Sequence, residues 1–252
     1  MKIEKLPVKL TAEPLIEALF EVRFRSAVPV SNMLPGMLFQ ELGGAEHVRI
    51  ESLPTAQIPV EIRRTDPALQ NAPLMRLRWS GFGIGISDTS IIISMDGKYQ
   101  GWQLFKQAII KICQASINSG VIEKISRYSV KYIDLIPGGD EKSSGGMDLN
   151  LSIGNYKLDK ENAQIRLEVK DENFINILQL ITSAEAVISD GIKLKGSIVD
   201  IDTISLAAKS DPREFISILS ESLDAAHDVN KRIFFECLTK ETFEELGPIY
   251  ND

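Results

Sequence analysis

The segment from Ile16 to Phe24 alternates between apolar and charged residues, and this alternation restricts the folds open to the chain. In an extended strand the apolar side chains would lie on one face and the charged ones on the other: Ala18, Phe20, Val22 and Phe24 against Glu17, Glu21 and Arg23. Successive side chains of a strand point to opposite faces, so the pattern predicts a strand with one buried face. Strands of this kind favour an antiparallel sheet over a parallel sheet covered on both faces.

Other segments repeat the strand-like pattern. They are residues 47–53, 59–64, 74–80, 82–87, 90–95 and 127–136, and then 147–155, 163–170, 174–182 and 196–207. Helical spacing of apolar residues marks 31–42, where Pro35 and Gly36 limit the regular part, and 99–120, which ends at a glycine suited to a C-cap.

A longer helix is predicted after Asp211, which is a suitable N-cap. Pro212 suits the first helical position, and Glu214 completes a capping-box pattern. An apolar stripe then runs to Ile233, and Gly247 and Pro248 end a short following segment. Strands followed by a long helix indicate an α+β fold.

The segment 137–148 divides the chain into two halves. It contains four glycines, two serines and a proline, a composition typical of a linker. We therefore expect an N-terminal unit over 1–138, a linker over 139–148 and a C-terminal unit over 149–252. The two units would be similar, each a largely antiparallel sheet packed against a long helix. The repeats IDLI at 133–136 and IDTI at 201–204 raise the hypothesis of an internal duplication.

Charge is distributed unevenly between these halves. Residues 1–138 contain 16 Lys and Arg against 13 Asp and Glu, a balance of +3, whereas residues 139–252 contain 12 against 22, a balance of −10. The net charge of −7 argues against general binding to nucleic acid or to an anionic membrane, because such binding usually needs an excess of Lys and Arg.

The sequence also bears on the cellular compartment. No stretch approaches the roughly 20 apolar residues that cross a bilayer, and the N-terminal segment lacks the apolar core of a signal peptide. We therefore expect a cytoplasmic protein. Cys113 and Cys237 lie in helix-like apolar patterns, and we interpret them as buried hydrophobic residues rather than as a disulfide.

Two carboxylates, Asp200 and Asp202, lie two positions apart on a predicted strand and so leave the same face. A metal or acid/base site would need further ligands, and the chain offers only His47 and His227 with no metal-binding spacing. The favoured interpretation is that they form ion pairs with Lys or Arg of a neighbouring strand. His227 lies at the edge of the apolar stripe of the long helix, where a packing role is favoured over catalysis.

Glycines at 81, 83 and 85 resemble a phosphate-binding loop, but the run continues into a strand without a helix. We interpret it as a strand face that another segment approaches closely. The best functional candidates are arginines on the polar faces of predicted strands. They are Arg23, Arg25, Arg63, Arg76 and Arg78. If these strands are neighbours, the arginines would form a patch that recognises phosphate or carboxylate. The alternative is a solvated face interleaved with Glu17, Glu21 and Glu61.

Landmarks spread over the chain resemble those of a sporadically distributed bacterial family whose members have no assigned activity. They are P-L-x-E-A-x-x-E-V-x-F at Pro14, Leu15, Glu17, Ala18, Glu21, Val22 and Phe24, then Tyr99, Trp102 and Phe105, then Arg127, Tyr128, Tyr132 and Ile133, and finally Asp200, Asp202, His227, Phe234, Phe235 and Thr239. The resemblance implies a full-length, stand-alone bacterial protein. It supplies no cofactor or catalytic residue, and the sporadic distribution is consistent with mobile-element or defence systems.

Two functional hypotheses follow. The first is a non-catalytic binding or regulatory protein, without a cofactor or metal, that recognises a protein partner or a small anionic ligand. The second is an enzyme acting on a phosphorylated or nucleotide-like substrate. In that case the arginines would hold the anion, and Asp200, Asp202 or His227 would act as acid, base or metal ligand.

Overall fold

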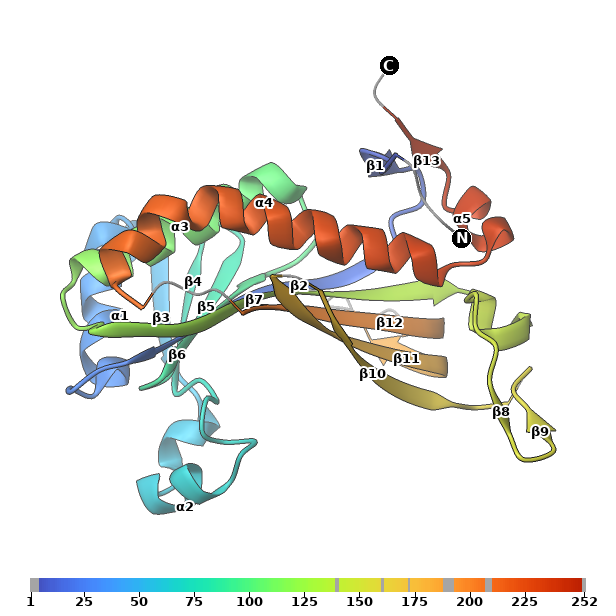
Figure 1. The fold of residues 1–252 in the computed structure, drawn as a ribbon. Helices are drawn as coiled ribbons and strands as arrows, with labels where there is room; N and C mark the ends of the chain where they lie inside the picture. Colours follow the sequence, from blue (N-terminus) through green and yellow to red (C-terminus); the bar gives the residue numbers. More distant parts are fainter. Residues whose placement is uncertain are drawn as a thin grey trace. The chain divides into compact units, whose positions relative to one another are not determined.

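The computed structural model describes residues 5–138, 141–159, 161–171, 173–187, 193–206 and 210–250. Its main sheet has nine strands in the order β10-β11-β12-β7-β2-β6-β5-β4-β3 (Figure 1). Their bounds are β2 Leu15–Arg25, β3 Val48–Ser52, β4 Met75–Trp79, β5 Phe82–Ile86, β6 Ser90–Met95, β7 Lys124–Pro137, β10 Gln164–Lys170, β11 Phe174–Val187 and β12 Lys193–Ser205. Together with the helices, this antiparallel sheet confirms the predicted α+β class.

The chain divides into two compact units that differ from the predicted halves. Unit 1 comprises Met1–Ala18, Lys131–Ile204 and Ala225–Asp252, and unit 2 comprises Leu19–Val130 and Ser205–Asp224. Strands of both predicted halves, β7 and β12, are neighbours within unit 1. A separate sheet for each predicted half is therefore wrong, because the chain returns to extend the existing sheet. An independent folding boundary at 139–148 stays a prediction, as does the duplication.

The glycine-rich segment predicted as a linker is packed within unit 1. Residues 139 and 140 lie outside the described residues, but Ser143–Gly146 forms the short 3-10 helix η4 and is mostly buried. A Cβ placed on Gly145 would lie 2.4 Å from Ser197 Oγ, and the φ of Gly145 is +67°. Glycine is needed here because the backbone approaches β12 closely in a left-handed conformation.

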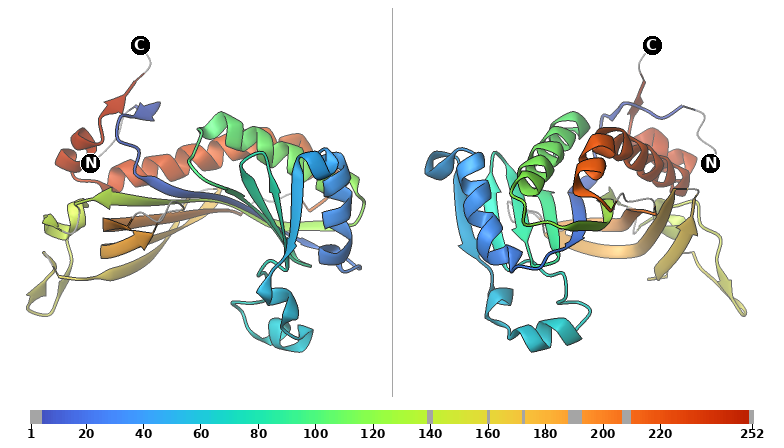
Figure 2. Two further views of the ribbon diagram at one scale, coloured as in Figure 1. Left: turned by 180° about the vertical axis from the view of Figure 1, so that it is seen from behind. Right: turned by 60° about the vertical axis from the view of Figure 1, so that its left-hand side comes forward.

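In unit 2, α1 (Val30–Glu41) and α3 (Trp102–Asn118) contact each other, while α2 (Val60–Thr65) lies in the connection between β3 and β4, away from both (Figures 1 and 2). The prediction of a strand at 59–64 is wrong, because α2 occupies this segment. A six-residue stretch with apolar residues at 60 and 62 fits one helical turn as well as a strand. Helix α1 continues through Pro35, which is buried beside Leu34 and Leu38.

The core of unit 2 follows from the strand register. Ile50, Leu77, Ile84, Ile93 and Phe20 lie opposite one another across β3, β4, β5, β6 and β2. All except Ile50, on the edge strand, are fully buried. Helix α3 adds the fully buried Phe105, Ile109 and Ile112. Burial of each such side chain contributes roughly 1.5–3 kcal/mol.

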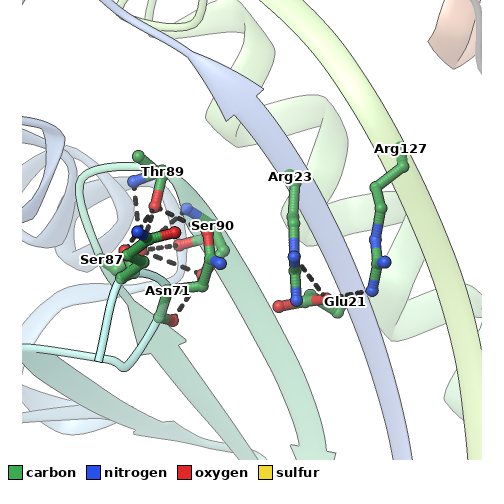
Figure 3. A network of polar contacts seen from close by, with 8 residues as sticks. Glu21, Arg23, Asn71, Ser87, Thr89, Ser90 and Arg127 are labelled. Carbon is green, nitrogen blue, oxygen red and sulfur yellow. Dashed lines mark hydrogen bonds and ion pairs between the residues drawn. The ribbon is translucent and has the colours of Figure 1, made fainter. Parts of the chain in front are cut away.

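The glycine run forms strand β5, as the sequence indicated. A Cβ on Gly85 would lie 2.8 Å from Pro73 Cγ, so the absence of a side chain lets the 71–74 segment pack on the strand. Hydroxyls at the β5–β6 turn hold this segment: Ser90 Oγ donates to Asn71 O at 2.9 Å, and Thr89 Oγ1 donates to Asn71 Oδ1 at 2.9 Å (Figure 3).

Helix α4 (Pro212–Cys237) begins where the sequence predicted. The backbone N–H groups of Arg213 and Glu214 donate to Asp211 Oδ1 at 2.8 and 3.0 Å, which confirms the N-cap. Phe215, Leu219 and Leu223 of the predicted stripe are fully buried.

The core of unit 1 joins α4 to β11 and β12, through residues that include Leu178, Leu180, Val199, Ile201, Phe234 and Phe235. Asn230 of α4 donates from Nδ2 to Ile201 O at 2.9 Å and to Thr203 Oγ1 at 3.0 Å. The smaller elements of this unit are β1 (Lys9–Leu10) paired with β13 (Pro248–Ile249), β8 (Ser152–Ile153) paired with β9 (Tyr156–Lys157), and α5 (Lys240–Glu245). The predicted strand 147–155 is thus reduced to β8. Within the described ranges, no helix has the length and apolarity needed to cross a membrane.

Candidate functional site

Arg76 and Arg78 of β4 lie on the face of the sheet opposite the buried Leu77. Arg76 Nη1 is 3.7 Å and Arg78 Nε is 3.5 Å from Glu51 Oε1 of β3, and Arg78 Nη1 also pairs with Asp96. Hydrogen bonding to Asp96, with the charges of Asp96 and Glu51, raises the pKa of Arg78 above its ordinary value. Both arginine side chains remain 44% exposed. A ligand in solvent can therefore reach both guanidinium groups.

A third arginine joins this group through the strand register. Arg49 of β3 lies directly opposite Arg78 of β4 and is exposed. Like charges directly opposite on neighbouring strands destabilise a sheet. We call Arg49, Glu51, Arg76, Arg78 and Asp96 the edge cluster. Its three cations and two carboxylates, on β3, on β4 and directly after β6, give a formal charge of +1.

A second charged group lies on β2 and β7, also within unit 2. Arg23 Nε donates to Glu21 Oε2 at 2.9 Å, and Arg127 Nη2 donates to the same oxygen at 3.0 Å (Figure 3). The Glu21 side chain is 15% exposed. Arg127 Nε is buried, with no hydrogen-bond partner among the described residues. We call Glu21, Arg23 and Arg127 the central cluster; it too has one cation more than carboxylates.

The five predicted arginines do not form one patch. β5 and β6 separate β4 from β2, so the strands of the two clusters are about 14 Å apart at the usual strand spacing. Arg25 is exposed at the last position of β2. Arg63 lies on α2 rather than on a strand, and its Nε donates to Ile58 O at 3.0 Å. The structure brings Arg76 and Arg78 together with each other and leaves Arg23, Arg25 and Arg63 in other places.

Asp200 forms the ion pair that the sequence favoured. Its Oδ2 lies 2.8 Å from Lys131 Nζ on the neighbouring strand β7. Asp202 is partly buried on the same face of β12. In the described part of the chain, no group of three or more His, Cys, Asp and Glu side chains is arranged to hold a metal ion.

His227 of α4 is joined to the sheet of unit 1. Its Nδ1 lies 3.0 Å from Tyr132 Oη, and the two rings meet edge to face with centroids 5.6 Å apart. This geometry suits the packing and hydrogen-bonding role that the sequence favoured.

A buried carboxyl group, Asp134 of β7, was not among the sequence candidates. It is 6% exposed, and burial raises its pKa well above the ordinary value, with further contributions from the negative charges of Glu13 and Asp200. Glu13 is exposed as a whole residue, yet partial burial of its carboxyl raises its pKa against the lowering effect of Lys231 and Lys9. Asp134 can therefore hold a proton at a pH where surface carboxylates are charged.

The cysteine thiols are unsuited to nucleophilic or redox chemistry. Burial raises the pKa of Cys113 far above its ordinary range and that of Cys237 to about 11. Both are free and stay protonated at neutral pH.

Sequence reasoning missed Arg49, Arg127 and Asp134 as site candidates. Arg127 carried a usable signal, since it lies on the polar side of an alternating strand. Arg49 could be identified only from the β3–β4 register, and Asp134 only from the packing around β7. Comparison with known proteins finds no family model and no curated protein that match the chain.

Proposed function

We propose that the protein is a non-catalytic binding or regulatory protein that uses the edge cluster to recognise an anionic group. The anion is a phosphate or carboxylate, either on a free small molecule or on a protein partner. The pairing of Arg49 directly against Arg78 is the observation that carries this proposal. The arrangement costs stability in the absence of a ligand, and a bound anion would relieve that cost.

The geometry of the cluster supports recognition rather than simple solvation. Glu51 and Asp96 hold Arg76 and Arg78 in place, and the guanidinium groups keep donors that the two carboxylates do not use. Guanidinium groups held in this way can bind phosphate or carboxylate oxygens in pairs.

The test is the thermal stability of the protein with tripolyphosphate or with an oligoglutamate peptide, at constant ionic strength. We expect the melting temperature to rise with at least one probe and the rise to be lost in Arg49→Gln and Arg76→Gln. Arg64→Gln on α2 is the matched control, because Arg64 lies outside the edge cluster. A rise with tripolyphosphate alone favours a free phosphorylated ligand, and a rise with the peptide alone favours an acidic protein segment. Equal shifts in wild type and Arg49→Gln would contradict the proposal.

A second candidate function, an enzyme acting on a phosphorylated or nucleotide-like substrate, is favoured by Asp134. A carboxyl with a raised pKa beside Glu13 has the properties of a general acid. Its test is hydrolysis of p-nitrophenyl phosphate and of nucleoside triphosphates by wild type and by Asp134→Asn. Turnover by wild type that falls at least a hundredfold in Asp134→Asn would replace the binding proposal with this one.

We further infer a bacterial cytoplasmic setting, membership of the sporadically distributed family, and an origin by duplication. The two free cysteines support the cytoplasmic setting. The landmark residues, in their expected order, support membership of the bacterial family. The duplication is supported by the chain order, because α3 follows β6 and α4 follows β12, so each run of strands precedes a long helix.

A further inference from the structure

Strand β10 of unit 1 has one unpaired edge. It pairs with β11 on one side and is the terminal strand of the sheet, with no described strand on its outer side (Figure 1). All of its residues except Ile165 are exposed, and the apolar Leu167 and Val169 are 45% and 44% exposed. An open edge that carries apolar side chains is a template for pairing with another strand.

The hydrogen bonds to β11 show which backbone groups of β10 are available. Thr182 N donates to Ala163 O at 3.0 Å, and Asp171 N donates to Phe174 O at 2.8 Å. These hydrogen bonds lie at the two ends of the β10–β11 pair and agree with its register. In an antiparallel pair, every second residue turns its N–H and C=O toward the partner strand. Odd-numbered residues of β10 therefore face β11. The backbone groups of Gln164, Arg166, Glu168 and Lys170 point to the open edge.

The sequence of β10, Gln-Ile-Arg-Leu-Glu-Val-Lys, is complementary to itself when reversed about Leu167. Reversal sets Arg166 against Glu168, Ile165 against Val169, and Gln164 against Lys170. Residues whose backbone groups point to the open edge then lie opposite one another, so hydrogen bonds can form between the two backbones. Opposite charges also meet directly across the new pair, and apolar residues meet on the other face.

We propose that β10 pairs antiparallel with β10 of a second copy of this chain, with the two-fold axis at Leu167. The contact is isologous, since each copy gives the same strand and receives the same strand. Charge complementarity selects a second copy as the occupant, because the Arg166–Glu168 pair forms twice. The pairing covers Leu167 and Val169 and satisfies the outward backbone groups of both strands. This inference concerns assembly and does not depend on the edge cluster.

The primary experiment is sedimentation equilibrium of the wild type and of two charge reversals, Arg166→Glu and Glu168→Arg. Wild type is expected at twice the chain mass. Each reversal sets like charges opposite each other twice, so each variant should dissociate at a concentration about tenfold higher or more. A wild-type monomer at all accessible concentrations would overturn the proposal, as would a dimer indifferent to both changes.

The two reversals provide their own matched controls. In a mixture of Arg166→Glu with Glu168→Arg, every cross-strand charge pair is again complementary, so a heterodimer should form at concentrations where each variant alone is dissociated. The double variant, with both changes in one chain, should likewise regain the wild-type mass. If the mixture and the double variant both remained monomeric, the pairing of Arg166 with Glu168 across the two copies would be refuted.

A covalent test covers the case in which a reversal disturbs folding. Leu167→Cys places a thiol on the two-fold axis, where the two Cβ atoms would be about 4.5–5.5 Å apart. Mild oxidation should give a disulfide-linked dimer. Lys170→Cys is the control, because its partner is Gln164 and not itself. Cross-linking of Lys170→Cys as readily as Leu167→Cys, or no cross-linking of Leu167→Cys, would contradict the pairing.

Discussion

Two charged residues of strand β7, Arg127 in unit 2 and Asp134 in unit 1, lie in different environments. In unit 2, Arg127 lies 29% exposed beside Arg23, and both bind one carboxylate, Glu21. In unit 1, Asp134 is almost fully buried, with the negative charges of Glu13 and Asp200 near enough to raise its pKa. Arg127 thus lies in a partly exposed ion-pair group, whereas Asp134 is a buried carboxyl that favours the neutral form. The first arrangement suits recognition of an outside anion, and the second suits retention of a proton.

The largest expected effect comes from removing the buried carboxyl. Because the pKa of Asp134 is raised in the folded state, the folded protein holds a proton that the unfolded chain releases. Stability therefore falls as pH rises from the ordinary pKa of 3.8 toward the raised value. Asp134→Asn should be more stable than wild type at pH 8, with the difference shrinking toward pH 4. Urea unfolding at both pH values measures this, and parallel pH profiles for the two proteins would contradict it.

The next effect tests the central cluster. Glu21→Gln leaves Arg23 and Arg127 without their shared carboxylate, and the cost should be about 1–2 kcal/mol of unfolding free energy, between that of an exposed and that of a buried pair. Urea unfolding at pH 7 gives the value, and Glu46→Gln at an exposed site is the control. A loss no larger than that of the control would mean that the cluster does not hold β2 to β7.

A smaller effect is expected at the ion pair of unit 1. Asp200→Asn removes the partner of Lys131 and should lower stability by about 0.5–1 kcal/mol. Addition of Mg²⁺, Mn²⁺ or Zn²⁺ should leave the melting temperature of both proteins unchanged. A metal-dependent rise in wild type that Asp200→Asn abolishes would revive the metal interpretation of this carboxylate.

The smallest expected change in unfolding free energy comes from Arg49, and, like that of Asp134→Asn, it is a stabilisation. Arg49→Gln removes the like-charge pair with Arg78 and should stabilise the unliganded protein by a few tenths of a kcal/mol, more at low salt than at high salt. Unfolding at two salt concentrations measures it. If Arg49→Gln were less stable than wild type at both salt concentrations, Arg49 would contribute to the stability of the fold. The main support for an anion site would then be lost.

Local patterns predicted much of the fold. Alternation indicated β2, β4 and β7, and the Asp211–Pro212 pair marked the start of α4, because these signals depend on neighbours in the chain. The six-residue segment at 59–64 was misassigned, since so short a run fits either period. Pro35 and Gly36 were expected to limit the regular part of α1, but the helix continues through both, with Pro35 buried.

Local patterns in the chain predict the residue types on each strand face, the alternation of the strands and the helix start at Asp211. Which of these residues come into contact depends on the three-dimensional fold. Strand order placed β5 and β6 between the arginines of β2 and β4, register set Arg49 against Arg78, and packing enclosed Asp134. Strand order and register are fixed by the total burial of apolar faces over the whole chain. Contacts among charged residues distant in sequence follow from that burial, and no local pattern encodes them.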